Sequence, residues 1–135
     1  MKGKIFTPDE ANRMLPLVSR IADDIVATYT RVQKTLEDLE ALKAVEDEEV
    51  RDLQERRLEV ESARLLDRFQ TLIEEIEELG GTVKDYERGC IDFYGEVDGE
   101  IVYLCWQRGE DAITHWHALD AGFRDRNPIP LPSAA

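Results

Sequence analysis

The sequence has little cysteine and histidine, no long apolar run, and few basic residues for its many acidic ones. Its 135 residues include two cysteines and two histidines, and 17 Lys and Arg stand against 30 Asp and Glu, a formal net charge of −13. Two cysteines cannot form the disulfide framework of a small secreted domain, which favours a reducing compartment. No run of about 20 apolar residues is present, so we expect no membrane-spanning segment. The negative charge would repel nucleic-acid phosphates and anionic lipid headgroups, so we expect neither as a partner.

Several motifs of known chemistry are also absent. The sequence has no Gly-rich phosphate loop, no Cys-x-x-Cys pair and no His-Glu-x-x-His motif. Both histidines follow residue 110, so the Glu-rich first half cannot supply the Glu-x-x-His motif of a di-iron site. The basic first residues are not followed by an apolar segment, because Asp9, Glu10 and Arg13 interrupt it. We therefore expect no secretory signal and a cytoplasmic location.

The distribution of glycine divides the chain into two halves. No glycine occurs between Gly3 and Gly80, whereas residues 80–122 contain seven. The first half is therefore predicted to be helical and the second to consist of strands and turns. The chain length and its 42% of apolar residues predict one domain, residues 1–135, with its own core.

Two apolar stripes in the first half predict a helical hairpin. Apolar positions recur alternately every four and three residues from Met14 to Leu42 and again from Leu58 to Leu79, which is the spacing of packed helices. The two stripes differ in register, and an acidic run separates them. We therefore expect a turn near residues 44–48, with one continuous helix as the alternative.

The start of the helical half contains a cap and a proline. Thr7, Pro8 and Glu10 have the order of a capped helix N-terminus. Pro16 follows soon after, and proline in a helix interior removes a hydrogen bond. We therefore predict a short first helix and a long one that begins near Pro16.

The second half predicts a small antiparallel sheet. Residues 91–97 and 100–106 alternate in polarity around Asp98-Gly99, a strong signal for a two-residue hairpin turn. This register places Asp92 opposite Cys105. Shorter strands are expected at residues 82–86 and 113–119, and the proline-rich residues 124–132 are expected to form an extended arm.

The two faces of this hairpin differ in character. One face is apolar and should pack on the helices, whereas the other face is mixed. The mixed face carries Cys90, Asp92, Tyr94, Glu96, Ile101, Tyr103 and Cys105. If Trp116 points to the core, His115 and His117 join the mixed face. Its sulfur, nitrogen and carboxylate groups would then suit zinc or iron, or a Cys–His nucleophile pair. The alternative is a sheet face with a buried thiol and hydrogen-bonded histidines.

The residues after this sheet offer a second candidate site. Arg124 and Arg126 lie close to Asp120 and Gly122, and an arginine pair in such a loop can hold a carboxylate or a phosphate. The alternative is that these arginines pair with acidic side chains of the protein.

Two stretches of the chain resemble a known family. Residues 6–12, with Leu15-Pro16 after them, and the later residues Tyr103 to Trp106, Gly109-Glu110 and Trp116-His117 resemble the bacterial family called domain of unknown function 2203. The resemblance implies no established activity, cofactor or substrate. The positions that match the family pattern, and that we predict to bind a ligand, are Cys105, Trp106, Glu110, Trp116, His117, Asp120, Phe123 and Arg126. Cys90 and His115 depart from the pattern, which reduces the candidate metal ligands to Cys105, His117 and Asp120.

The predicted fold is α+β. It has a coiled-coil-like antiparallel helical hairpin with a short N-terminal helix (residues 7–80), a small antiparallel sheet (81–120) and an extended C-terminal arm (121–135). Because so small a sheet cannot cover helices about 45 Å long, we expect a homodimer formed through the helices.

The sequence leaves two functions open. The first is a non-enzymatic, homo-oligomeric interaction or scaffold protein. The second is a small-molecule- or metal-binding protein, or an enzyme, with its site around Cys105, His117, Asp120 and Arg126. Convergence of these side chains in one cleft would favour the second function.

Overall fold

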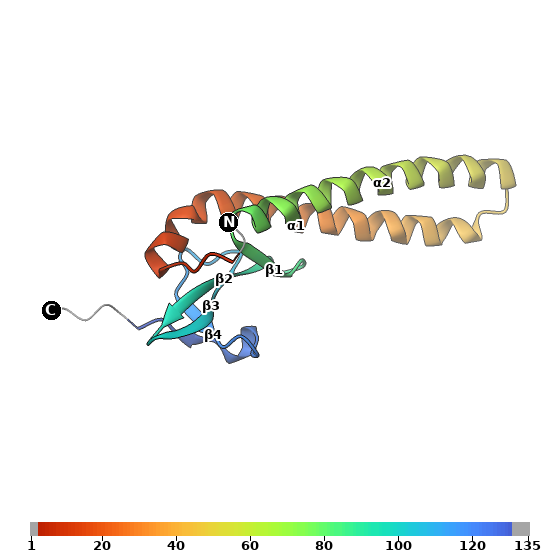
Figure 1. The fold of residues 1–135 in the computed structure, drawn as a ribbon. Helices are drawn as coiled ribbons and strands as arrows, with labels where there is room; N and C mark the ends of the chain where they lie inside the picture. The colour runs from red at the N-terminus through yellow and green to blue at the C-terminus, as the bar shows by residue number, and fades with distance from the viewer. Residues whose placement is uncertain (1–2, 131–135) are drawn as a thin grey trace.

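A long helical hairpin packs against one face of a five-stranded sheet (Figure 1). The computed structural model describes residues 3–130. Its helices are α1 (Pro8–Ala41), the short 3-10 helix η1 (Leu42–Ala44) and α2 (Glu48–Glu78). The sheet follows, with β1 (Gly81–Asp85), β2 (Cys90–Val97), β3 (Glu100–Gln107), β4 (His115–His117), the 3-10 helix η2 (Phe123–Asp125) and β5 (Asn127–Pro128). The strands lie in sequence order and every neighbouring pair is antiparallel, so the predicted α+β fold is confirmed.

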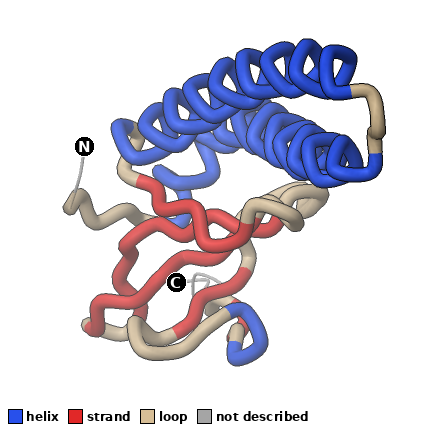
Figure 2. Tube along the Cα trace, turned by 90° about the vertical axis from the view of Figure 1, so that its right-hand side faces the viewer, coloured by secondary structure: helices blue, strands red, loops and turns tan. Residues whose placement is uncertain are grey.

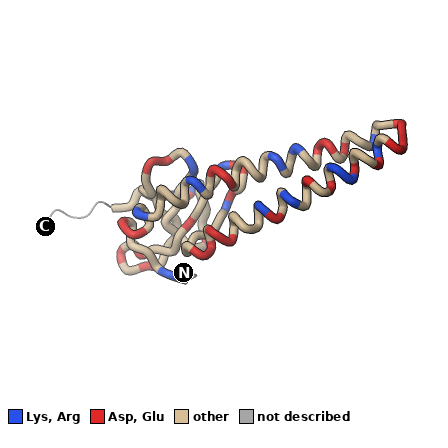
Figure 3. Tube along the Cα trace, turned by 90° about the horizontal axis from the view of Figure 1, so that it is seen from above, with Lys and Arg blue, Asp and Glu red and all other residues tan. Residues whose placement is uncertain are grey.

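The turn of the helical hairpin lies where the change of register predicts it. After η1 the chain is extended, and Asp47 begins α2 by accepting a hydrogen bond from the Val50 N–H at 3.1 Å. The apolar stripes face each other, and their buried members are Val18, Ile21, Ile25, Thr28, Val32, Thr35, Leu65, Leu72 and Ile76. The helices extend well beyond the sheet, and acidic and basic residues are interspersed along both of them (Figure 3). Within residues 3–130, neither helix is both long and apolar enough to cross a membrane.

The predicted separate N-terminal helix is wrong, because α1 continues through Pro16. A capping box fixes its first turn: the Glu10 N–H donates to Thr7 Oγ1 at 3.1 Å, and the Thr7 N–H donates to Glu10 Oε1 at 2.9 Å. Ala11 and Leu15 in the following turn are buried in the core that the helices share with the sheet. Because capping and burial stabilise this segment, the hydrogen bond that Pro16 cannot donate is lost without ending the helix.

The β2–β3 hairpin has the predicted register, with Val97 opposite Glu100 and Asp92 opposite Cys105. Asp98 and Gly99 have φ values of 52° and 82°, as a type I′ turn requires. The face that packs on the helices is fully buried and carries Ile91, Phe93, Leu104 and Trp106. Because side chains alternate along a strand, Asp92 and Cys105 lie on the opposite face.

The predicted C-terminal stretch follows the sheet and, within the described residues, contains the 3-10 helix η2 and the short strand β5. Figure 2 shows the η2 segment on the side of the sheet away from the helical hairpin. The chain then returns as β5, which places Asn127 opposite Trp116, and the Ile129 N–H donates to the Thr114 carbonyl at 2.8 Å. Prolines are compatible with β5 because it is an edge strand. The third predicted strand is shorter than residues 113–119, and residues 131–135 of the predicted arm lie outside the described residues.

Candidate metal centre

Asp92, Cys105 and His117 meet on the sheet face that is turned away from the helices. Asp92 in β2 is paired with Cys105 in β3, and His117 in β4 is paired with Tyr103, two residues before Cys105. One donor atom of each of the three side chains lies within 4.8 Å of the other two. All three residues are buried, and none is more than 3% exposed. An oxygen, a sulfur and a nitrogen donor are therefore close enough to bind one ion.

The His117 ring is held at both nitrogens. Its Nδ1 lies 2.8 Å from the Ala118 carbonyl oxygen, and its Nε2 lies 2.9 Å from Asp92 Oδ2. A carbonyl oxygen only accepts hydrogen bonds, so we assign a hydrogen to Nδ1 and direct Nε2 at the carboxyl group. One proton then bridges Nε2 and the Asp92 carboxyl. Histidines that bind metals are commonly oriented in this way, with the second ring nitrogen donating to a backbone carbonyl.

The second carboxyl oxygen of Asp92 has no hydrogen-bond partner, although it is buried. A buried polar atom without a partner costs about 1–3 kcal/mol. Burial raises the pKa of the Asp92 carboxyl, and this effect exceeds the lowering by the His117 ring, the Cys105 thiol and Lys84. A bound cation would both satisfy this oxygen and favour the ionised carboxylate.

The Cys105 thiol is not activated as a nucleophile. Burial raises the pKa of this thiol far above its usual range, the Asp92 carboxyl adds to the rise, and Arg126 opposes it without reversing it. Nucleophilic attack needs the thiolate, and the His117 Nε2 that could take the proton is hydrogen-bonded to Asp92. The geometry therefore favours metal binding over a Cys–His nucleophile pair, since a metal ion stabilises the thiolate directly.

A cavity of about 250 Å³ adjoins the three donors. Its other lining residues are Lys84, Asp85, Arg88, Cys90, Ala121, Gly122 and Phe123. The Cys90 thiol points to the Gln107 side chain, with Sγ 3.9 Å from Oε1, and burial raises its pKa to about 11. Cys90 is not in the group of donors within 4.8 Å of one another. The site thus has three protein donors and an adjoining space.

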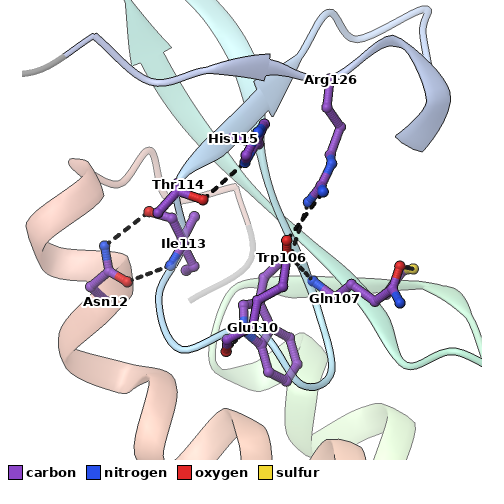
Figure 4. Close-up of polar contacts among 9 residues, drawn as sticks. Asn12, Trp106, Gln107, Glu110, Ile113, Thr114, His115 and Arg126 are labelled. Atoms are coloured by element: carbon purple, nitrogen blue, oxygen red, sulfur yellow. Dashed lines mark hydrogen bonds and ion pairs between the residues drawn. The ribbon is translucent and has the colours of Figure 1, made fainter.

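Other residues that match the family pattern form a polar network beside the donors (Figure 4), and its Arg126 also acts on the Cys105 thiol. Arg126 donates to both Glu110 carboxylate oxygens, at 2.9 and 3.1 Å, and the Gln107 N–H donates to the same carboxylate at 2.7 Å. The Trp106 indole N–H donates to the Glu110 carbonyl at 2.9 Å. Asn12 of α1 exchanges two hydrogen bonds with the backbone of Ile113. The network fixes the loops that follow β3, and Glu110 and Arg126 form an ion pair with each other.

The structure brings together only part of the predicted site. Cys105 and His117 lie in it and Phe123 lines its cavity, whereas Trp106 is in the core and Trp116 packs against the core. Asp120 is exposed in the turn after β4, and Asp92 takes the place of the predicted carboxylate.

His115 was expected on the same sheet face as the donors. Its Nδ1 is hydrogen-bonded to the Thr114 hydroxyl at 2.9 Å. The predicted pairing of Asp92 with Cys105 was the sequence feature that could have identified Asp92 as the carboxylate of the site. No sequence feature singled out Lys84 or Arg88.

We expect Glu110→Gln to lower the free energy of unfolding by about 1–3 kcal/mol at neutral pH, because Arg126, with a side chain only 14% exposed, loses its carboxylate partner. Burial alone would raise the pKa of the Glu110 carboxyl, but Arg126 and the Gln107 N–H bring it below its ordinary value of 4.5. The stabilisation is therefore present above that ordinary value and is lost as the pH falls through the lower value of the folded state. Urea unfolding at about pH 7 and pH 3.5 should show a smaller difference between the two proteins at the lower pH. An equal difference at both would contradict this.

The comparisons with known proteins identify a family. The family model described as "Uncharacterized conserved protein (DUF2203)" matches residues 4–129. Comparison with curated proteins and with solved structures finds no match. The matched range includes both helices, the sheet and all three donors of the candidate metal centre. The chain therefore belongs to the DUF2203 family of uncharacterized conserved proteins.

Proposed function

We propose that this protein binds a divalent transition-metal ion, with Zn²⁺ as the best match, through Asp92, Cys105 and His117. The observation that carries the proposal is the convergence of three different donors within 4.8 Å on three buried side chains. A thiolate and an imidazole select zinc or iron, whereas calcium and magnesium prefer oxygen donors alone.

Two features distinguish this cluster from a hydrogen-bonded structural network. In such a network nearly every buried polar atom has a partner, but one oxygen of Asp92 has none. A cavity also adjoins the donors, so an ion has space beside them. Structural zinc sites normally have four protein ligands, and sites with three keep an exchangeable position. We therefore propose an open metal site rather than a structural one.

Native mass spectrometry of metal-free protein after reloading with Zn²⁺ tests this function. We expect one zinc ion per wild-type chain and none in His117→Ala. His115→Ala is the matched control, since His115 lies on the same strand but outside the donor group, and it should retain the ion. Folded wild-type protein without zinc, or equal loading of His117→Ala, would contradict the proposal.

We further propose that the protein assembles as a cytoplasmic homodimer through its helices, as an interaction protein would. The helix α2 exposes four large apolar side chains, Leu66 among them, and three of these form a stripe: Val50 (48% exposed), Leu53 (67%) and Val60 (60%). They are spaced by three and seven residues, as in a helix–helix seam. A two-fold axis can pair such a stripe with its own copy. Both cysteines are free, which supports a reducing compartment.

Light scattering on protein at micromolar concentration should give the mass of a dimer. We expect Leu53→Glu with Val60→Glu to give a monomer of unchanged helicity, because charges then replace the apolar stripe. Arg13→Gln with Arg20→Gln is the control, since it changes the net charge equally at exposed positions of α1 away from the stripe, and it should remain dimeric. A monomeric wild-type protein would show that the stripe has no second copy as its partner.

A further inference from the structure

We propose that the exchangeable position of the metal binds a small oxyanion, a carboxylate or a phosphate, which Lys84 and Arg88 hold in the adjoining cavity. This inference rests on the metal site proposed above. It is carried by the charge, the size and the lining of the cavity.

The rim of the cavity is basic in a strongly acidic protein. Lys84 at the end of β1 and Arg88 in the turn before β2 both line it. Within residues 3–130, neither side chain forms an ion pair. The Lys84 ammonium lies 4.5 Å from the centre of the Tyr103 ring, on the sheet face that carries the donors. Two cations that form no ion pair within the described residues therefore flank the space next to the metal donors.

Asp85 also lines the cavity, but its carboxylate forms hydrogen bonds within the turn between β1 and β2. Asp85 Oδ1 accepts hydrogen bonds from the Glu87 and Arg88 N–H groups, at 2.9 and 2.8 Å, and so shapes the turn that carries Arg88. A Zn²⁺ ion bound by one thiolate and one carboxylate is neutral overall. Lys84 and Arg88 add two positive charges and Asp85 adds one negative charge, so the site with its ion has a net charge of +1. The completed site therefore favours an anion over a neutral ligand.

The size of the cavity limits the ligand. Its volume is about 250 Å³, below the roughly 300–1,000 Å³ of sites for larger ligands. Ala121 and Phe123 add apolar surface to its lining, and an added Cβ at Gly122 would meet nothing within 4 Å. An oxyanion with a short apolar part fits these walls. Its oxygen would take the metal position, since oxygen is a normal zinc ligand beside nitrogen and sulfur.

The test uses Co²⁺-loaded protein, because the visible bands of Co²⁺ respond to its ligands. Titration with inorganic phosphate and, separately, with acetate should change these bands saturably, whereas chloride at equal ionic strength should not. A response to phosphate alone assigns the site to phosphates, and a response to acetate assigns it to carboxylates. We expect Lys84→Gln with Arg88→Gln to raise the Kd of the responding anion about tenfold, or about 1.4 kcal/mol, while one Co²⁺ per chain still binds.

The control is Lys4→Gln with Arg20→Gln, which removes the same charge from exposed positions that do not line the cavity and should leave the Kd unchanged. Bands that respond to neither anion, or an unchanged Kd in Lys84→Gln with Arg88→Gln, would overturn the inference. So would a weaker thiolate band in Cys90→Ser, since it would make Cys90 the fourth ligand. Failure of Co²⁺ to bind at all would instead contradict the proposed metal function.

Discussion

Zn²⁺ at a thousand times its Kd should raise the free energy of unfolding of the wild-type protein by about 4 kcal/mol. The reason is that the three donors come from three strands and meet only in the folded sheet. An ion that binds the folded chain and not the unfolded one stabilises the fold by mass action. Urea unfolding with Zn²⁺ and with a chelator measures this difference.

Two cysteine variants make this result specific. Cys105→Ala should lose the stabilisation by Zn²⁺, because it removes the sulfur donor. Cys90→Ala should keep it, although Cys90 is also buried and lines the same cavity. Equal stabilisation of Cys105→Ala and wild type would show that the ion binds elsewhere.

Trp106→Ala should lower the free energy of unfolding by about 3–5 kcal/mol in the absence of metal. Trp106 is 1% exposed in the core between the sheet and the helices, and its indole N–H donates to the Glu110 carbonyl. Its removal leaves a large cavity and an unpartnered carbonyl. Since small domains are stable by only about 5–15 kcal/mol, this variant would be close to unfolding. Urea unfolding of the chelator-treated protein provides the measurement.

Two further variants separate packing from hydrogen bonding in this prediction. Trp106→Phe retains most of the apolar volume and should cost less than Trp106→Ala. Trp116→Ala should also cost less, because Trp116 is only partly buried and packs at the edge of the core. A loss below about 1 kcal/mol in Trp106→Ala would contradict the central position of Trp106 in the core.

The parts of the fold that the sequence predicts well are those fixed by local signals. Asp98-Gly99 determines the turn, and the turn determines the whole β2–β3 register, including the pairing of Asp92 with Cys105. The two apolar stripes and the acidic run between them similarly predict the helical hairpin. In both cases a short segment sets the geometry of the residues on either side.

The parts that it predicts poorly depend on contacts between distant residues. The position of β4 is fixed by β3 and by two hydrogen bonds between Asn12 and Ile113, 101 residues apart. Alternation along the strand places His117 on the face of Asp92 only if Trp116 points to the core, and no local pattern settles that condition or indicates that Asp120 stays exposed. A match to the family pattern does not distinguish metal donors from structural residues either. Trp106, Glu110 and Arg126 match the pattern, but they hold the loops after β3.

The absorption spectrum of the wild-type protein during titration with Co²⁺ tests the metal site most directly. We expect one Co²⁺ per chain, with a thiolate-to-metal charge-transfer band and the visible bands of a four-coordinate ion, since Cys105 supplies one ligand and the open position a fourth. Cys105→Ser should lose the charge-transfer band. Bound Co²⁺ without that band in the wild-type protein, or no Co²⁺ bound to folded protein, would contradict a metal site at Asp92, Cys105 and His117.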